Sequence, residues 1–375
     1  MTEGKIPRPR RTIRFLWPPE IAGTMCYLAR HPEVAASARA AVHMDMVGGS
    51  HATTKAIFHL TRTPASLPSA VNDVAAVFGE WVIDGSRRAA MSGDVTDALY
   101  APEGSKEMLL AEVSPFTMGS DHDVLQDGSF RIPTIYLNDW PDVFIHTNDD
   151  VPANVDATKL RRVAVIGAAS GHFLAAMGGD EARRLALEVF ARGAARQGDA
   201  LRRALARGDS GPVTVARFEE AQGLIDEAAR QERGALASVA TFAPADASVA
   251  SLLADLAKRV DGRKADGHAL VNRHVAIPAD VVPDDPAGRV VPKRTPGLAG
   301  PMSVYYGDHL QDRLGASPPG DPLVPYETLN LVDGKRSVRE IRDVLRANYA
   351  PTTSREVLDY LKVLEKAGVV TLGGR

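Results

Sequence analysis

The chain has 375 residues, of which 45% are hydrophobic, so it is long enough for two or three domains with a substantial core. Its net charge of −3 gives no reason to expect nucleic acid or an acidic membrane surface as a partner, and its one cysteine excludes an internal disulfide. No stretch approaches the roughly 18 apolar residues of a membrane span, and the basic amino terminus lacks the apolar part of a signal peptide. The cytoplasm is therefore the default compartment, although the sequence does not determine it.

The first 177 residues alternate between strand-like and helix-like segments. Strands are predicted at residues 12–17, 41–47, 55–61, 107–113 and 132–137. Helices are predicted at residues 20–30, 71–90 and 157–177, the last with Asp156 as its N-cap. The first of these helices holds Cys26, which we expect to be buried. This order predicts an α/β domain over residues 1–179, with three layers and a mostly parallel sheet covered by helices on both faces.

Residues 180–260 are rich in Ala, Arg, Glu and Leu with helical periodicity. Breaks at Gly208–Gly211 and Ala243–Ala247 predict a helical hairpin followed by a shorter helix. The charged positions form either a solvated face or a surface that pairs two copies into a homodimer, and both interpretations stay open. Residues 261–320 are rich in Pro, Gly and Asp, which is typical of a linker or covering segment.

The last 55 residues, 321–375, form a further predicted domain. Capping boxes at Ser337–Glu340 and Thr353–Glu356 open two helices, and a strand follows the glycine at position 368. Helix, helix and strand in this order is typical of a winged helix. This segment carries 9 Lys and Arg against 8 Asp and Glu, so it lacks the basic face that duplex binding needs.

Two polar signatures follow predicted strands. Asp45 lies between methionines and is followed by two glycines, and a buried carboxylate there needs a cation, a hydrogen-bond cluster or water. His146 follows an apolar segment, and an imidazole at a strand end is a natural zinc ligand whose other ring nitrogen Asp149 or Asp150 could hold. The alternatives are a turn-capping aspartate and a structural histidine.

Two further motifs could carry chemistry. Glu20 follows a double proline at a strand-to-helix junction, where a carboxylate can act as a general base or a metal ligand. The alternative is an N-terminal helix residue that the helix dipole favours. Ser120, Asp121 and His122 form a polar cluster in a loop. This cluster lacks the Gly-x-Ser-x-Gly pattern of a nucleophile elbow, so a serine hydrolase is not favoured.

The order of these motifs resembles the zinc-dependent aminopeptidase family, which includes bacterial secreted leucyl aminopeptidases, glutamate carboxypeptidase II and the transferrin receptor ectodomain. The resemblance is carried by residues 44–48, 120–122 and 146–150. It implies that Asp45 binds one zinc ion and His146 the other, with Glu20 as the catalytic carboxylate. Ser120, Asp121 and His122 would shape the substrate-side loop. The implied activity is hydrolysis of N-terminal peptide bonds in a peptide or aminoacyl substrate by a metal-activated water.

The family also uses a His-x-Asp motif that lies farther upstream. The eleven residues that precede Thr12 in this sequence do not contain that motif. We therefore expect residues 1–179 to represent the second half of the peptidase domain, with an incomplete site for one or two zinc ions. Two functions remain open at this point. One is a metallo-aminopeptidase, for which activity of this chain alone is undecided. The other is a non-catalytic, peptidase-like scaffold for binding or dimerisation.

Overall fold

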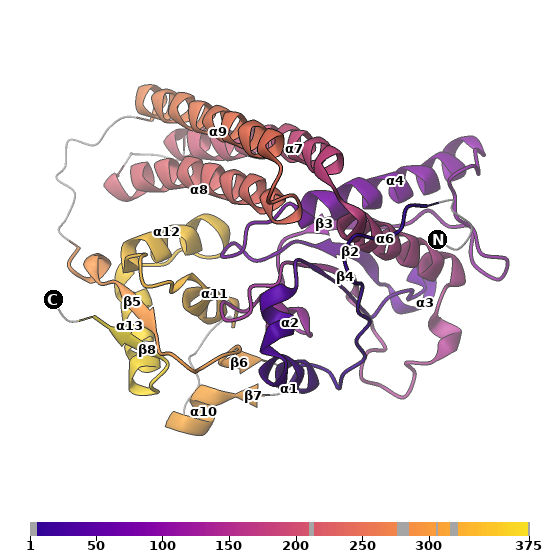
Figure 1. Ribbon diagram of the computed structural model, residues 1–375, viewed down its shortest axis with the longest axis horizontal. Helices are drawn as coiled ribbons and strands as arrows, with labels where there is room; N and C mark the ends of the chain where they lie inside the picture. The colour runs from indigo at the N-terminus through magenta and orange to yellow at the C-terminus, as the bar shows by residue number, and fades with distance from the viewer. Residues whose placement is uncertain (1–5, 210–213, 276–284, 305–306, 316–321, 374–375) are drawn as a thin grey trace.

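The computed structural model describes residues 6–209, 214–275, 285–304, 307–315 and 322–373 (Figure 1). Its central sheet has four strands in the order β1–β4–β2–β3. Their bounds are Ala41–Asp45 for β1, Ile57–Thr61 for β2, Ala111–Ser114 for β3 and Thr134–Trp140 for β4. The chain is therefore mixed α/β, as the sequence predicted at the level of fold class.

The sheet is mixed, because one of its three strand pairings is antiparallel. β1 pairs with β4 and β2 pairs with β3 in parallel, whereas β2 and β4 are antiparallel. The segment between β1 and β2 holds only the four-residue helix α3, His51–Thr54. A parallel crossover needs a dozen or more residues and usually a longer helix, so β2 runs back in the opposite direction.

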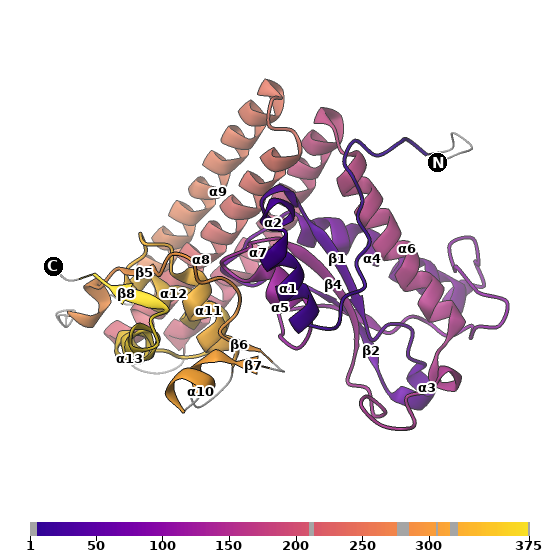
Figure 2. The same cartoon turned by 60° about the horizontal axis from the view of Figure 1, so that its bottom comes forward.

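The two faces of the sheet differ in chemistry because side chains alternate along each strand. Ile135 and Leu137 of β4 point to an apolar face, which α4 (Val71–Ser92) and α6 (Ala157–Ala176) cover. The helices α1 (Ala22–Arg30), α2 (Pro32–Ser37) and α5 (His122–Gln126) lie on the other side (Figure 2). The sheet is thus covered on both faces, and the second face holds the candidate site.

Residues 12–17 form no strand, contrary to the prediction. They have no regular secondary structure, with Phe15 72% and Trp17 86% exposed. Among the described residues, no strand pairs with this segment, and a segment becomes a strand only when its backbone groups are paired. The strand predicted at 107–113 is also wrong in its bounds, because only 111–114 pair. Cys26 is exposed, not buried.

The helical region consists of three long helices that pack side by side (Figure 1). They are α7 (Gly179–Asp209), α8 (Val215–Val239) and α9 (Ala247–His274). The predicted hairpin and the break before Ala247 are confirmed, whereas the break at Gly208–Gly211 lies largely outside the described residues. The third helix is not short. It continues past residue 260 to His274, so that part of the predicted linker is helical.

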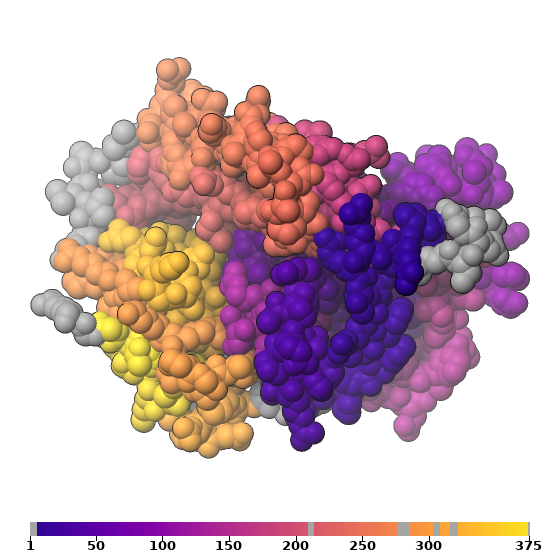
Figure 3. All heavy atoms as spheres, viewed as in Figure 1, coloured from indigo at the N-terminus to yellow at the C-terminus, as the bar shows by residue number. Residues whose placement is uncertain are grey.

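The C-terminal unit contains the two predicted helices and the final strand. Both capping boxes are present, at the start of α12 (Val338–Asn348) and of α13 (Ser354–Lys366). The last strand, β8 (Val370–Leu372), pairs antiparallel with β5 (Pro292–Arg294), which comes from the predicted linker. In the space-filling view this unit lies beside the amino-terminal segment (Figure 3).

Short elements complete the described chain. They are η1 (Pro152–Asn154), η2 (Ala240–Phe242), η3 (Ala287–Arg289), β6 (Ser303–Val304), β7 (Gly307–Asp308), α10 (His309–Leu314) and α11 (Leu323–Leu331). Among the helices of the described residues, none is both long and apolar enough to cross a membrane.

Gly85 allows α4 to approach the loop that follows it. A Cβ at this position would lie 2.5 Å from the backbone carbonyl oxygen of Asp97. We expect Gly85→Ala to lower the free energy of unfolding by about 1–3 kcal/mol, although alanine favours a helix, because backbone atoms must shift. Urea denaturation measures this. Gly223→Ala in α8 is the control. Apart from the local backbone of its own helix, no described atom lies within 4 Å of its Cβ, so it should stabilise by up to about 1 kcal/mol. Equal effects at both positions would contradict the prediction.

Candidate functional site

The candidate site lies on the polar face of the sheet, under α1 and α5. His43 and Asp45 are two residues apart on β1 and therefore share this face. His43 pairs with Tyr136 of β4, and their rings stack with centroids 5.0 Å apart. Farther along the same face, Thr61 of β2 donates a 3.0 Å hydrogen bond to Oδ1 of Asn138. Three neighbouring strands thus present polar side chains in place of an apolar core.

Ser120 joins the groups of this site. Its Oγ lies 2.8 Å from Oδ2 of Asp45, 3.0 Å from Oε1 of Glu20 and 2.9 Å from Nε2 of His43. A hydroxyl has one hydrogen to donate, so it can serve only one of the two carboxylates at a time. The structure therefore brings Glu20, Asp45 and Ser120, all predicted from sequence, to one point.

Strained backbone positions follow both carboxylates. Ile21, directly after Glu20, is fully buried and has φ 57°, and Met46, directly after Asp45, has φ 54°. A β-branched residue in the left-handed region is a genuine outlier that its surroundings must impose. The Ile21 N–H donates to Oδ1 of Asp121 at 2.7 Å. The predicted Asp121 thus positions the segment that carries Glu20.

The pKa values of both histidines of the site are lowered by burial. Nε2 of His122 donates to the Thr117 carbonyl at 2.6 Å, and the His122 ring stacks on Tyr136 at a centroid distance of 3.9 Å. Burial, with the charge of His43 as a smaller cause, lowers the pKa of His122 to about 3. Burial also lowers the pKa of His43, against the opposing effects of Asp45 and Asp121. His122 is thus part of the packed wall of the site.

A buried ion pair anchors the turn that follows Asp45. Nζ of Lys159 lies 2.7 Å from Oδ1 of Asp139 and donates to the Gly49 carbonyl at 2.9 Å. Oδ2 of Asp139 accepts from the Gly49 N–H at 2.8 Å. Burial raises the pKa of Asp139, and the adjacent Lys159 opposes that rise. Both backbone groups of Gly49 are therefore held by one pair of charges.

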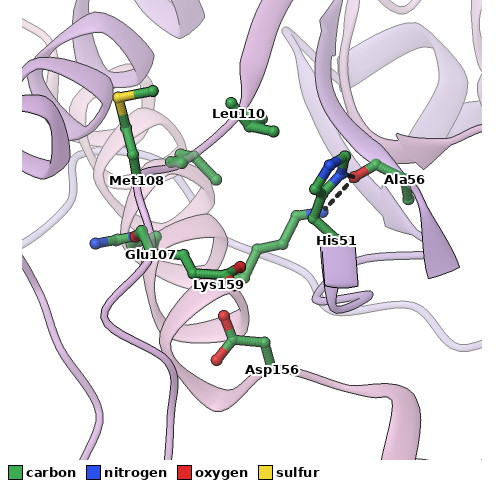
Figure 4. A pocket seen from close by; sticks show the side chains of 9 residues that line it. His51, Ala56, Glu107, Met108, Leu110, Asp156 and Lys159 are labelled. Carbon is green, nitrogen blue, oxygen red and sulfur yellow. Dashed lines mark hydrogen bonds between the residues drawn. The ribbon is translucent and has the colours of Figure 1, made fainter. Parts of the chain in front are cut away.

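A cavity of about 20 Å³ lies beside Lys159 (Figure 4). Its polar wall includes His51, Glu107 and Asp156, and Nδ1 of His51 lies 3.2 Å from the Ala56 carbonyl oxygen. This volume holds about one water molecule. The cavity is thus too small for a substrate, and the site on the polar face remains the candidate.

The other predicted ligands lie in the loop after β4. His146, Asp149 and Asp150 are all exposed, and His146 has φ 59°. Asn154 donates to the backbone carbonyl of Asp149 at 2.8 Å. Within the described residues, no three His, Cys, Asp or Glu side chains form a group that could hold a metal ion. His146 therefore does not complete a three-ligand site with Asp45 and Glu20 in this structure.

The acidic groups of the site lack cationic partners. Within the described part of the chain, no lysine or arginine forms an ion pair with Glu20, Asp45 or Asp121. This excess of negative charge distinguishes the site from the paired carboxylates elsewhere in the chain, such as Asp139.

Sequence reasoning missed four residues of this region. His43 could have been found, because it lies two residues before Asp45 in a predicted strand and must share its face. Tyr136 had the same kind of signal in the strand predicted at 132–137. Lys159 and the buried Asp123 carried no local signal, since each matters only through its tertiary surroundings.

Comparisons with known proteins identify no relative. No protein-family model matches the chain, and no curated protein or solved structure matches it.

Proposed function

We propose that the polar face of the sheet is the site of a metallopeptidase-like hydrolase that acts on N-terminal peptide bonds. The observation that carries this proposal is the convergence of the Glu20 and Asp45 carboxylates on the Ser120 hydroxyl, within 3.0 Å and 2.8 Å. Two carboxylates without a cationic side chain are suited to binding a metal cation. The resemblance of the motifs to zinc-dependent aminopeptidases supports zinc as that cation.

The residues present fit zinc in donor type. Asp45 and Glu20 offer carboxylate oxygens and His146 an imidazole, all of which zinc accepts. Because His146 lies outside a three-ligand group in the described residues, we propose that its loop supplies the imidazole when zinc binds. Zinc would supply Lewis acidity. In this arrangement Ser120 and Asp121 orient the two carboxylates, and Glu20 is the group that can exchange a proton with substrate or water.

Backbone strain supports the same location for the site. Six non-glycine residues of the described chain have positive φ, and three of them are His146 and the neighbours of Glu20 and Asp45. Strained backbone concentrates at functional sites, where the surrounding structure maintains it.

The test is zinc analysis of the purified protein combined with hydrolysis of aminoacyl anilides. We expect about one zinc ion per chain or more, and we expect Asp45→Asn to weaken zinc binding at least about tenfold and to reduce hydrolysis by about 100-fold or more. Asp84→Asn on the exposed side of α4 is the control and should change neither. Less than about 0.2 zinc ion per chain together with no hydrolysis would exclude the proposal for this chain.

The second candidate is a non-catalytic scaffold that uses the same sheet for binding. The exposed position of His146, outside a three-ligand group, favours it. Stable folding with neither zinc nor hydrolysis would support this candidate over the first.

We further propose that the C-terminal unit is a winged helix. Helices α12 and α13 followed by the β5–β8 ribbon support this assignment. Its nearly balanced charge, 9 basic against 8 acidic residues over 321–375, favours an interaction within the protein over duplex binding.

A further inference from the structure

The loop that carries Ser120 lies between the sheet and the C-terminal unit. Phe116, at the start of this loop, stacks on Tyr326 of α11 with ring centroids 5.6 Å apart and an interplanar angle of 17°. Phe116 also meets His122 edge-on at 5.5 Å, and His122 stacks on Tyr136. A continuous row of rings therefore joins α11 to the strand beneath the site.

Hydrogen bonds from the C-terminal unit hold both ends of α5. The buried Tyr326 hydroxyl donates to the backbone carbonyl of Asp123 at 2.8 Å. Beyond α5, the Gly128 N–H donates to Oδ1 of Asn330 at 2.8 Å, and Nη1 of Arg294 donates to Oγ of Ser129 at 3.0 Å. These polar contacts bind the site loop to the C-terminal unit.

Asp123 connects the hydrogen bond from Tyr326 to the turn that carries Ser120. The Asp123 N–H donates to the Ser120 carbonyl at 3.0 Å, and Oδ2 of Asp123 accepts from the Gly119 N–H at 2.8 Å. Fixing Asp123 therefore fixes the turn at Gly119–Ser120. That turn places the Ser120 hydroxyl between the two carboxylates.

We propose that Tyr326 is a positioning residue for Ser120, so that the C-terminal unit completes the site from the opposite end of the sequence. Tyr326 contacts neither carboxylate and acts through Asp123 and Phe116. The proposal rests on the proposed function only for the chemistry of the site, because the positioning itself follows from the contacts of Tyr326.

Amide hydrogen exchange of the 375-residue chain tests the positioning directly. We expect Tyr326→Phe to accelerate exchange about tenfold at residues 119–127, because the Asp123 carbonyl loses its donor. Tyr349→Phe is the matched control. Its hydroxyl binds Oε2 of Glu327 and the Ala65 N–H, both at 2.8 Å, and so anchors the same unit away from the loop. This variant should leave exchange at 119–127 unchanged.

Zinc affinity is the second readout, and we expect Tyr326→Phe to weaken it several-fold while Tyr349→Phe does not. Unchanged exchange in Tyr326→Phe, or equal acceleration in both variants, would overturn the positioning role. Local acceleration in a protein that binds no zinc and hydrolyses no substrate would retain the positioning role and reject the proposed function. If circular dichroism shows that Tyr326→Phe is unfolded, Phe116→Leu is measured in its place, with the same acceleration expected.

Discussion

Replacing Lys159 with methionine is expected to lower the free energy of unfolding by about 3–5 kcal/mol. The Lys159 and Asp139 side chains are only 6% and 1% exposed, and their charged atoms lie 2.7 Å apart. Methionine would fill a similar volume but leave the Asp139 carboxylate buried without its cation. Urea denaturation followed by circular dichroism would measure the loss, and the turn at Gly49 should become less protected from hydrogen exchange.

Two variants separate this loss from a general effect of removing a cation. The double variant Lys159→Met with Asp139→Asn should recover most of the stability, since no unpaired charge remains and the amide oxygen can still accept from Gly49. Arg233→Ala breaks an exposed ion pair with Asp261 and should cost less than about 1 kcal/mol. If Lys159→Met lowers the free energy of unfolding by less than about 1 kcal/mol, the fold does not depend on the ion pair between Lys159 and Asp139.

The contribution of the Asp123 carboxyl to the stability of the chain is expected to fall as pH rises from about 4 to 8. Burial raises the pKa of its carboxyl to about 8, whereas an unfolded aspartate titrates near 3.9. Between these pH values the folded chain keeps a proton that the unfolded chain has released. The contribution of Asp123 is therefore fully present below about pH 4 and is lost as pH rises through 8, by several kcal/mol in total.

Asp123→Asn isolates this effect. The amide cannot ionise, and its oxygen can still accept from the Gly119 N–H. Unfolding free energies of the wild type and the variant, measured at pH 5 and pH 8, should differ by several kcal/mol more at pH 8, in favour of the variant. His122 is common to both proteins, so its own titration largely cancels in the comparison. A difference that is the same at both pH values would mean that Asp123 is already ionised in the folded chain.

Local sequence patterns predicted most elements of the fold. The helical periodicity of residues 71–90, the N-cap at Asp156 and the two capping boxes each correspond to a helix in the structure. Elements that depend on a neighbour were predicted poorly. Residues 12–17 have strand-like composition but pair with no strand of the described chain, and the direction of β2 follows from the short connection before it.

The candidate site shows the same contrast between features that local sequence predicts and features that depend on distant residues. Glu20, Asp45, Ser120 and Asp121 were identifiable because acidic and hydroxyl groups at strand and helix ends are distinctive in a sequence. Their joint contact through one hydroxyl was not predictable, since Ser120 lies 75 residues from Asp45 and 100 from Glu20. The residues that hold the site in place are more distant still.

The contacts of α11 have a consequence for how the chain matures during synthesis. Tyr326 and Asp123 are 203 positions apart, and the buried Glu327 binds Ser66 across 261 positions. A ribosome releases the amino-terminal segments first, and domains fold as their residues emerge. The turn at Gly119–Ser120 therefore lacks its final partners until α11, which lies about 200 residues after Asp123, has left the ribosome. The polar face of the sheet matures only then, long after its own strands have been synthesised.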